Sequence, residues 1–338
     1  MQAERTLERC GDNPALVLEQ HAAERAGEPL TEFPDRLTHA ESIPGLPRRR
    51  PECTGVEIVP GGRSNTGGHC NGHRHGQELG TLDVRPIPAF QDNYIWLLSG
   101  LDDPRAVAVV DPGDAGPVLR TLTAGNLRLD AILVTHHHAD HVGGVAELVA
   151  ASGATVFGPA RENMPVEVRR LGAGDRVRLA TLGLEFEVID VPGHTAGHIA
   201  YFGHDALFCG DTMFSAGCGR LFEGTATQML ASLDALAALP ESTRVFCGHE
   251  YTLANLRFAM TVEGGNSDIA TYARNAEGLR AANRPTLPST IGLEKRVNPF
   301  LRSRLDNVQL SAERHAGRPL ATPVAVFAEI RGWKDNFR

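Results

Sequence analysis

A run of imidazole and carboxylate side chains, His136-x-His138-x-Asp140-His141, follows directly on the apolar segment Ala131–Thr135. These groups are ligands that suit zinc, iron and manganese ions. In an extended loop, alternate residues point to the same side, so His136 and His138 can reach one ion. Asp140 and His141 stand where the chain enters the next predicted helix and can face a second ion. The run therefore predicts the beginning of a metal site.

Three further apolar segments each end shortly before a ligand-type side chain, namely His194, Asp211 or His249. In open α/β folds, ligands collect at the C-terminal edge of the strands. Seven ligands are more than one ion takes in a site with an open position, so the set predicts two ions. We expect Asp211 to bridge them. The other six ligands divide into two sets of three, His136, His138 and His194 for one ion and Asp140, His141 and His249 for the other.

Other residues of the same types are interpreted as structural. His137, His198 and His204 are expected to be satisfied within the protein or to support the ligands, not to bind metal. Asp111, which follows a predicted strand, is expected to form a turn or to support a ligand. The tract from His69 to His75 looks metal-binding by composition, but its Gly-rich surroundings favour a solvated segment.

Charge and composition argue against some classes of protein. The 338 residues carry a formal net charge of -8, which argues against nucleic-acid binding. The longest apolar runs fall short of the roughly 18 to 20 residues of a membrane span. Six cysteines without paired spacing favour free thiols, and no signal-peptide pattern is seen at the N-terminus. We therefore expect a cytoplasmic monomer that acts on a small molecule.

The pattern of apolar and polar residues divides the chain into three regions. Residues 1–80 contain few apolar residues at a helical or strand period, so we expect disorder or loose packing there, apart from a short helix over Ala15–Ala26. Residues 81–252 alternate between strands and helices, as in a layered α/β domain. Residues 253–338 are expected to form a small helical domain. The predicted strands are Tyr94–Leu98, Ala106–Val110, Ala131–Thr135, Thr155–Phe157, Leu184–Val191, Ala206–Phe208 and Arg244–Cys247. The predicted helices are Pro117–Thr123, Val142–Ala151, Thr227–Leu239, Leu253–Val262, Ile269–Asn283, Asp306–His315 and Pro323–Ile330.

The seven ligands resemble the signature of the metallo-β-lactamase superfamily, and within it residues 81–338 resemble the hydroxyacylglutathione hydrolases (glyoxalase II). The metal motif alone is specific only to the superfamily. The narrower resemblance rests on further segments, which are Phe90–Tyr94, Gly217–Thr225, Gly248–Thr252, Thr286–Thr290, Asn298–Arg302 and Arg331–Arg338.

This resemblance implies an αββα sandwich followed by a small C-terminal α-helical domain. It also implies two divalent metal ions, with zinc favoured and iron or manganese accepted by the same ligands. The implied reaction is the hydrolysis of S-D-lactoylglutathione to D-lactate and glutathione, the second step of methylglyoxal detoxification. Glutathione contacts carry over to Arg220, Tyr251, Arg331 and Lys334. Phe222 stands where many members have Tyr, so a hydroxyl contact is lost there.

The residues suit this chemistry without the family name. Two cations lower the pKa of a water between them, so that hydroxide is available near neutral pH to attack a thioester carbonyl. Asp211 and Asp140 are the catalytic candidates, and Asp140 can accept a proton as well as bind metal. The basic pair Arg331 and Lys334 suits a carboxylate-bearing substrate, although a solvated basic face is the alternative. The rival readings are an iron-dependent persulfide dioxygenase, a β-lactamase, a nuclease and a metal-binding scaffold without activity.

Overall fold

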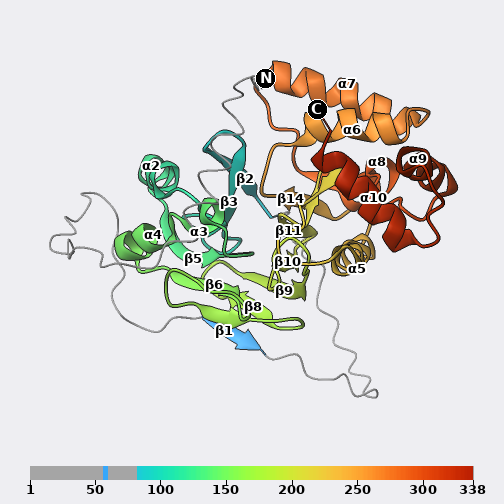
Figure 1. Ribbon diagram of the computed structural model, residues 1–338. Coiled ribbons are helices and arrows are strands. Elements are labelled where there is room, and N and C mark those ends of the chain that lie inside the picture. Colours follow the sequence, from blue (N-terminus) through green and yellow to red (C-terminus); the bar gives the residue numbers. More distant parts are fainter. Residues whose placement is uncertain (1–55, 60–81, 338) are drawn as a thin grey trace, which may run out of the picture. The chain divides into compact units, whose positions relative to one another are not determined.

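The computed structural model describes residues 56–59 and 82–337 (Figure 1), all of which belong to one unit, Ser42–Arg338. The expected helix at Ala15–Ala26 and the tract from His69 to His75 lie outside the described residues. The rest of residues 1–80, which were predicted to be disordered or loosely packed, also lies outside the described residues, except Val56–Val59. These four residues form strand β1, which the sequence patterns did not predict.

The first sheet has six strands in sequence order, β2 to β7. The strands β2, β3 and β4 pair antiparallel, and β4 to β7 pair parallel. The helix α2 connects β4 to β5, and the helices α3 and α4 connect β5 to β6. The bounds of these elements are Val84–Ala89 (β2), Asn93–Ser99 (β3), Ala106–Val110 (β4), Ala115–Gly125 (α2), Arg128–Leu133 (β5), Ala139–Val142 (α3), Val145–Ser152 (α4), Thr155–Pro159 (β6) and Arg169–Leu171 (β7).

The second sheet has the order β1-β8-β9-β10-β11-β14-β15, and a small hairpin, β12–β13, follows β11 along the chain. Only β11 and β14 pair parallel in this sheet, since a helix, α5, connects them. The bounds are Arg176–Leu179 (β8), Leu184–Asp190 (β9), Ile199–Gly203 (β10), Ala206–Gly210 (β11), Met213–Phe214 (β12), Gly217–Cys218 (β13), Ala226–Ala237 (α5), Arg244–Cys247 (β14) and Ser289–Thr290 (β15).

The two faces of the first sheet enter different cores. In β3, Trp96 and Leu98 pack into the core that also contains residues of the second sheet. Ile95 and Leu97, on the opposite face, pack into a core with residues of α2 and α4. A strand that is buried on both faces is apolar throughout, which explains the continuous apolar run of β3. With α5 on the far side of the second sheet, this arrangement is the predicted αββα sandwich (Figure 1).

The C-terminal part is helical, as predicted. Its helices are α6 (Thr252–Val262), α7 (Ser267–Ala281), α8 (Ile291–Val297), α9 (Asp306–Ala316) and α10 (Pro323–Asp335). The helices α6, α7 and α8 share a core of small and aliphatic residues, while α10 packs on α5 and α9.

Most of the predicted elements are present within a few residues, and two strands, β4 and β14, have the predicted bounds. Besides β1, the strands β2, β7, β8, β10, β12, β13 and β15 and the helix α8 were not predicted. The strand β2 holds two prolines, which have no backbone N–H to donate. It lies at the edge of its sheet, where one side of the strand has no neighbouring strand to bond. Of the helix predicted over Val142–Ala151, Val142 ends α3 and the rest from Val145 on is α4. Between them, the N–H of Gly144 donates to the Pro112 carbonyl at 2.9 Å, outside the helix.

Candidate metal centre

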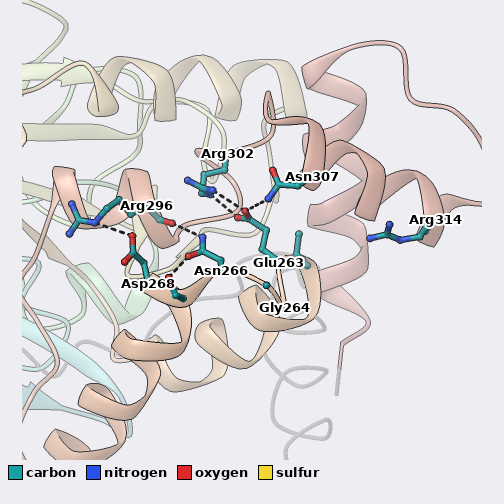
Figure 2. A pocket seen from close by; sticks show the side chains of 11 residues that line it. Glu263, Gly264, Asn266, Asp268, Arg296, Arg302, Asn307 and Arg314 are labelled. Atoms are coloured by element: carbon teal, nitrogen blue, oxygen red, sulfur yellow. Dashed lines mark hydrogen bonds and ion pairs between the residues drawn. The ribbon is translucent and has the colours of Figure 1, made fainter.

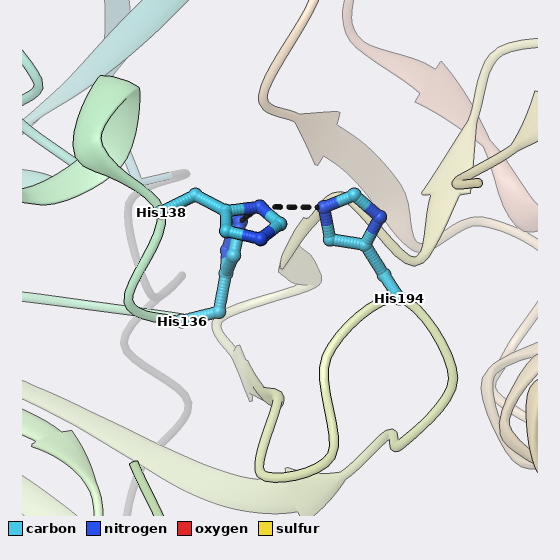
Figure 3. Close-up of side chains that lie close together, drawn as sticks. All are labelled: His136, His138 and His194. Carbon is cyan, nitrogen blue, oxygen red and sulfur yellow. Dashed lines mark hydrogen bonds between the residues drawn. The ribbon is translucent and has the colours of Figure 1, made fainter. Parts of the chain in front are cut away.

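Three imidazoles converge at the ends of strands from the two sheets (Figure 3). His136 and His138 follow β5, and His194 follows β9. The Nδ1 atom of His138 lies 3.2 Å from Nε2 of His136 and 3.0 Å from Nε2 of His194. Three ring nitrogens this close, with rings nearly perpendicular to one another, have the arrangement of a ligand set for a tetrahedral metal ion.

A second set lies beside the first. The short helix α3 carries Asp140 and His141, and His249 follows β14. The Oδ2 atom of Asp140 is 3.4 Å from Nε2 of His141 and 3.3 Å from Nε2 of His249. The side chain of Asp140 is 42% exposed, whereas both imidazoles are buried. The structure thus brings together the same two sets of three that the sequence spacing predicted.

Asp211, which directly follows β11, lies between the two sets. Its Oδ2 atom is 3.5 Å from Nε2 of His194 and 3.3 Å from Nε2 of His249, and its Oδ1 atom is 3.4 Å from Nε2 of His141. Both Nε2 of His141 and Oδ1 of Asp211 are buried and make no hydrogen bond. Such orphaned polar atoms are costly unless a ligand satisfies them. The residues therefore fit two metal ions that share one carboxylate.

Two glycines allow the backbone to come this close. A Cβ atom at Gly248 would lie 2.6 Å from Oδ1 of Asp211 and 2.7 Å from a ring carbon of His141. A Cβ atom at Gly219 would lie 1.9 Å from the carbonyl oxygen of Asp211. Any larger residue at either position would displace the bridging carboxylate or the chain that carries it.

Each of three imidazoles is oriented through its other ring nitrogen. The Nδ1 atom of His141 lies 3.1 Å from the Asp111 carboxylate, and that of His249 lies 2.8 Å from the Asp92 carboxylate. The Nδ1 atom of His194 donates to the Arg220 carbonyl at 2.8 Å. These bonds leave Nε2 of each ring free to bind metal, a common arrangement at metal sites. Asp111 accordingly supports a ligand, as the sequence predicted.

Asp111 also satisfies neighbouring groups. Its carboxylate accepts hydrogen bonds from the backbone N–H and the hydroxyl of Thr135, at 2.8 and 2.7 Å. Asp111, His136 and His141 also lie close enough together to hold an ion, but the Asp111 carboxylate is already engaged by Nδ1 of His141 and by Thr135. The two sets around Asp211 are therefore the better candidates.

The site residues shift the pKa values of one another in opposite directions. Burial, with a smaller contribution from neighbouring imidazoles, lowers the pKa of His136 well below its usual value and that of His138 to about 4. Burial opposes ionisation of Asp211, yet the imidazoles of His249 and His141 hold the pKa of its carboxyl well below the ordinary value. Against the effect of burial, Asp211 raises the pKa of His141 and of His249 above the usual value. Because a metal ion binds neutral imidazole and ionised carboxylate, a cation that binds these two rings displaces a proton from each.

The remaining histidines of this region contact protein atoms. His137 lies between two carboxylates, 3.0 Å from Glu162 and 3.4 Å from Glu223. His198 is fully buried, stacks on His136 and accepts a hydrogen bond from the backbone N–H of Asp211 at 3.2 Å. His204 accepts from a backbone N–H of β9. All three histidines therefore contact protein groups, in keeping with the structural roles that the sequence predicted for them.

The predicted substrate residues lie in two places. Tyr251 stacks on the imidazole of His249, with ring centroids 4.7 Å apart and planes 6° apart, so it borders the metal centre directly. Burial raises the pKa of its phenol to about 12, so the hydroxyl stays protonated near neutral pH. Of the other three, Arg331 and Lys334 lie on α10, and Arg220 pairs with Asp335 at the end of this helix.

Arg331 does not lie on a solvated basic face, which was the alternative interpretation of this residue. Its side chain is 8% exposed, with the guanidinium over the ring of Phe300. It donates to the Cys218 carbonyl at 2.8 Å and to Asp335 at 3.1 Å, which leaves Nε without a partner. Arg220, which is about half exposed, shares the same Asp335 oxygen at 3.2 Å.

Two supporting residues were not singled out from the sequence. Asn93 donates to the Asp140 carboxylate at 3.0 Å, and Asp92 orients His249 as described above. Both sit at the turn between β2 and β3, far in sequence from the ligands. Their only signal was a segment shared with the resembled family, since no local spacing relates them to the metal motif.

A pocket elsewhere, between α6, α7 and the loop after α8, contains none of the predicted site residues (Figure 2). Two of its cations are paired within the pocket, Arg302 with Glu263 at 2.7 Å and Arg296 with Asp268 at 3.5 Å.

Within the described residues, no helix is long and apolar enough to cross a membrane.

Two family models match the chain. The model of the metallo-beta-lactamase superfamily matches residues 92–249, and the model described as hydroxyacylglutathione hydrolase C-terminus matches residues 250–337. The hydroxyacylglutathione hydrolase of Albidiferax ferrireducens is 57% identical over 261 residues, which are 76% of this chain and all of that relative. The chain belongs to the hydroxyacylglutathione hydrolase family.

Other relatives of this family agree. The hydroxyacylglutathione hydrolase of Cupriavidus taiwanensis is 54% identical over 269 residues, again with all of the relative and 76% of this chain covered. Among solved structures, ETHE1 from Myxococcus xanthus superposes with a TM-score of 0.51 at 26% identity, covering 75% of this chain and 98% of that chain. The predicted metallo-β-lactamase fold is thus confirmed.

Proposed function

We propose that this member of the family hydrolyses S-2-hydroxyacylglutathione thioesters, with S-D-lactoylglutathione as the substrate and D-lactate and glutathione as the products. The observation that carries the proposal is the position of Asp211, whose two oxygens face ligands of both sets within 3.5 Å. A carboxylate between two sets of three ligands suits a centre with two cations, which thioester hydrolysis can use.

We propose His136, His138 and His194 as ligands of one ion, and Asp140, His141 and His249 as ligands of the other, with Asp211 shared. We favour zinc, because imidazole-rich sets suit it, although iron and manganese accept the same ligands. When bound, the ions would supply Lewis acidity toward the thioester carbonyl and make a water nucleophilic near neutral pH.

The chain's own residues orient this centre and keep it ionised. Asp92 and Asp111 hold the rings of His249 and His141 so that their Nε2 atoms point to Asp140 and Asp211. The nearby imidazoles of His141 and His249 and the amide of Asn93 oppose the effect of burial and hold the pKa of Asp140 below its ordinary value. Asp140 therefore enters the reaction as a carboxylate and is partly exposed, so it is placed to accept a proton from water.

The basic group at α10 is proposed to bind glutathione, which carries two carboxylates. Arg220 and Arg331 both pair with Asp335, and Lys334 adds a third positive charge near Arg331. Arg220 and Lys334 are the more accessible of the three, while Arg331 holds the Cys218 carbonyl beneath them. Tyr251 stacks on His249 beside the proposed metal centre, where it would contact the bound thioester.

We further propose that residues 81–252 form the catalytic domain and residues 253–338 the substrate-binding domain of a cytoplasmic monomer. The boundary between the two family models, at residues 249 and 250, supports this division. The unpaired cysteines of the described residues, Cys209, Cys218 and Cys247, are in keeping with a reducing compartment.

The test is hydrolysis of S-D-lactoylglutathione by the full chain, followed as loss of thioester absorbance, with metal content measured on the same sample. We expect turnover that depends on two equivalents of divalent metal and is lost on chelation. Oxygen uptake, measured in parallel, tests the alternative function as a persulfide dioxygenase. Two bound metals without thioester hydrolysis, or one iron with oxygen consumption, would contradict the proposal.

A further inference from the structure

The β12–β13 hairpin lies between two residues of the candidate metal centre. It begins two residues after Asp211 and ends two residues before Arg220, whose carbonyl accepts from His194. Its two ends are tied together, since the N–H of Gly219 donates to the Thr212 carbonyl at 3.2 Å. The hairpin therefore determines where the bridging carboxylate and the acceptor for His194 stand relative to each other.

The turn of the hairpin is held by side chains from the C-terminal helices. Asn255 of α6 donates to the Ser215 carbonyl at 3.0 Å, and Tyr272 of α7 meets the Ser215 hydroxyl at 2.8 Å. Asn298, which follows α8, donates to the carbonyls of Phe214 and Gly217 at 3.2 and 2.8 Å. Three helices thus fix a turn of four residues.

Glu294 of α8 is the central member of this network. It is fully buried, and its carboxylate accepts from the Ser215 hydroxyl at 3.0 Å, the Ala216 N–H at 2.8 Å and the Asn298 amide at 3.0 Å. Ala216 has a φ of 54°, a left-handed conformation that residues with a Cβ atom rarely adopt. The bond from its N–H to Glu294 helps to hold the turn in this conformation.

We propose that Glu294 is a positioning residue for the metal centre, through which the helical domain sets the place of Asp211 and the orientation of His194. The inference rests on the proposed function, because it takes these two residues as metal ligands. It assigns the C-terminal helices a second role beside substrate binding, namely the support of metal affinity.

The test is metal affinity, measured by competition with a chromogenic chelator, in Glu294→Leu and Glu294→Gln. Leucine leaves the Ala216 N–H without its acceptor and removes one of the acceptors of the Asn298 amide. We therefore expect the turn to shift and metal affinity to fall about tenfold or more. Glutamine keeps one acceptor for these donors, and its amide can donate to the Ser215 hydroxyl, which then donates to Tyr272. We therefore expect Glu294→Gln to restore affinity to within about threefold of the wild-type value.

The matched control is Glu263→Leu. Glu263 is another buried carboxylate of the helical region, where it binds Arg302 and Asn307 and does not contact the hairpin (Figure 2). We expect this variant to lower the melting temperature but to leave metal affinity unchanged. If Glu294→Leu does not fold, Ser215→Ala removes one bond to the carboxylate and should weaken metal binding less, in the same direction.

The absorption spectrum of the cobalt-substituted protein provides a second readout, because it reports coordination geometry independently of turnover. We expect a changed spectrum in Glu294→Leu and a wild-type spectrum in Glu263→Leu. Wild-type affinity and spectrum in folded Glu294→Leu, or an equal loss in Glu263→Leu, would overturn the inference. A wild-type chain that binds no metal would instead overturn the proposed function.

Discussion

Lys334 provides a prediction about the pH dependence of catalysis. Its ammonium group lies over the rings of Phe258 and Phe337 and donates to the Ala254 carbonyl at 3.4 Å. Burial, together with the positive charges of Arg331 and Arg257, lowers the pKa of Lys334 to about 8. Because a lysine is charged only below its pKa, the attraction for a substrate carboxylate is present at pH 7 and is lost as the pH rises through 8.

The size of the effect follows from the pKa. With a pKa of about 8, about half of the Lys334 side chains are charged at pH 8 and about one in eleven at pH 9. If only the charged form binds the carboxylate, kcat/KM falls about fivefold between these two values, since kcat/KM reports ionisations of the free enzyme. Lys334→Arg keeps its charge over this whole range, so the fall should disappear.

The assay is the initial rate at low substrate concentration from pH 7 to 9.5, corrected for spontaneous thioester hydrolysis. Lys295→Arg, on the exposed side of α8 beside Glu241, is the matched control and should behave like the wild type. The reasoning fails if kcat/KM of the wild type is flat across this range. It also fails if Lys334→Arg shows the same fall as the wild type.

Three more predictions follow from the structure. Asp211→Asn should retain less than two metal ions per chain and lose more than about 100-fold in turnover, measured by elemental analysis and thioester hydrolysis, because an amide is a poor bridge between two cations. Asp92→Ala should lower metal affinity about 10- to 100-fold in a chelator competition, because His249 loses the carboxylate that orients it. Trp96→Ala should lower the free energy of unfolding, measured in urea, by about 3–5 kcal/mol. The reason is that the Trp96 ring is buried between the sheets and its N–H donates to the Cys247 carbonyl. A loss below about 1 kcal/mol would contradict this prediction.

The spacing of the ligands predicted much of the candidate site. Each ligand directly follows an apolar strand or begins the next helix, so chain order and strand direction were enough to predict that seven side chains meet at one edge. The division into two sets with Asp211 between them also followed, because seven ligands are too many for one ion. The structure arranges them in these sets, with Asp111 in the supporting place that was predicted for it.

The supporting contacts could not be predicted in the same way. Asp92 and Asn93 reach His249 and Asp140 across the space between elements that are far apart in sequence, and Glu294 reaches the hairpin from a short helix that was not predicted. Such contacts depend on how elements pack, and no local period or spacing reports this. The burial of Arg331 could not be predicted for the same reason, because burial is decided by the neighbours of a side chain in the folded chain.

The sequence by itself determined the types and the order of the metal-binding residues, the layered α/β class and the helical C-terminal part. These depend on local patterns of apolar residues and on the chemistry of the side chains. Only the tertiary structure decided which ring nitrogen of each histidine faces the centre, how Arg220 and Arg331 share one acid, and how the helices hold the β12–β13 hairpin. The physical reason is that hydrogen-bond partners and desolvation are properties of the packed chain, in which residues distant in sequence become neighbours.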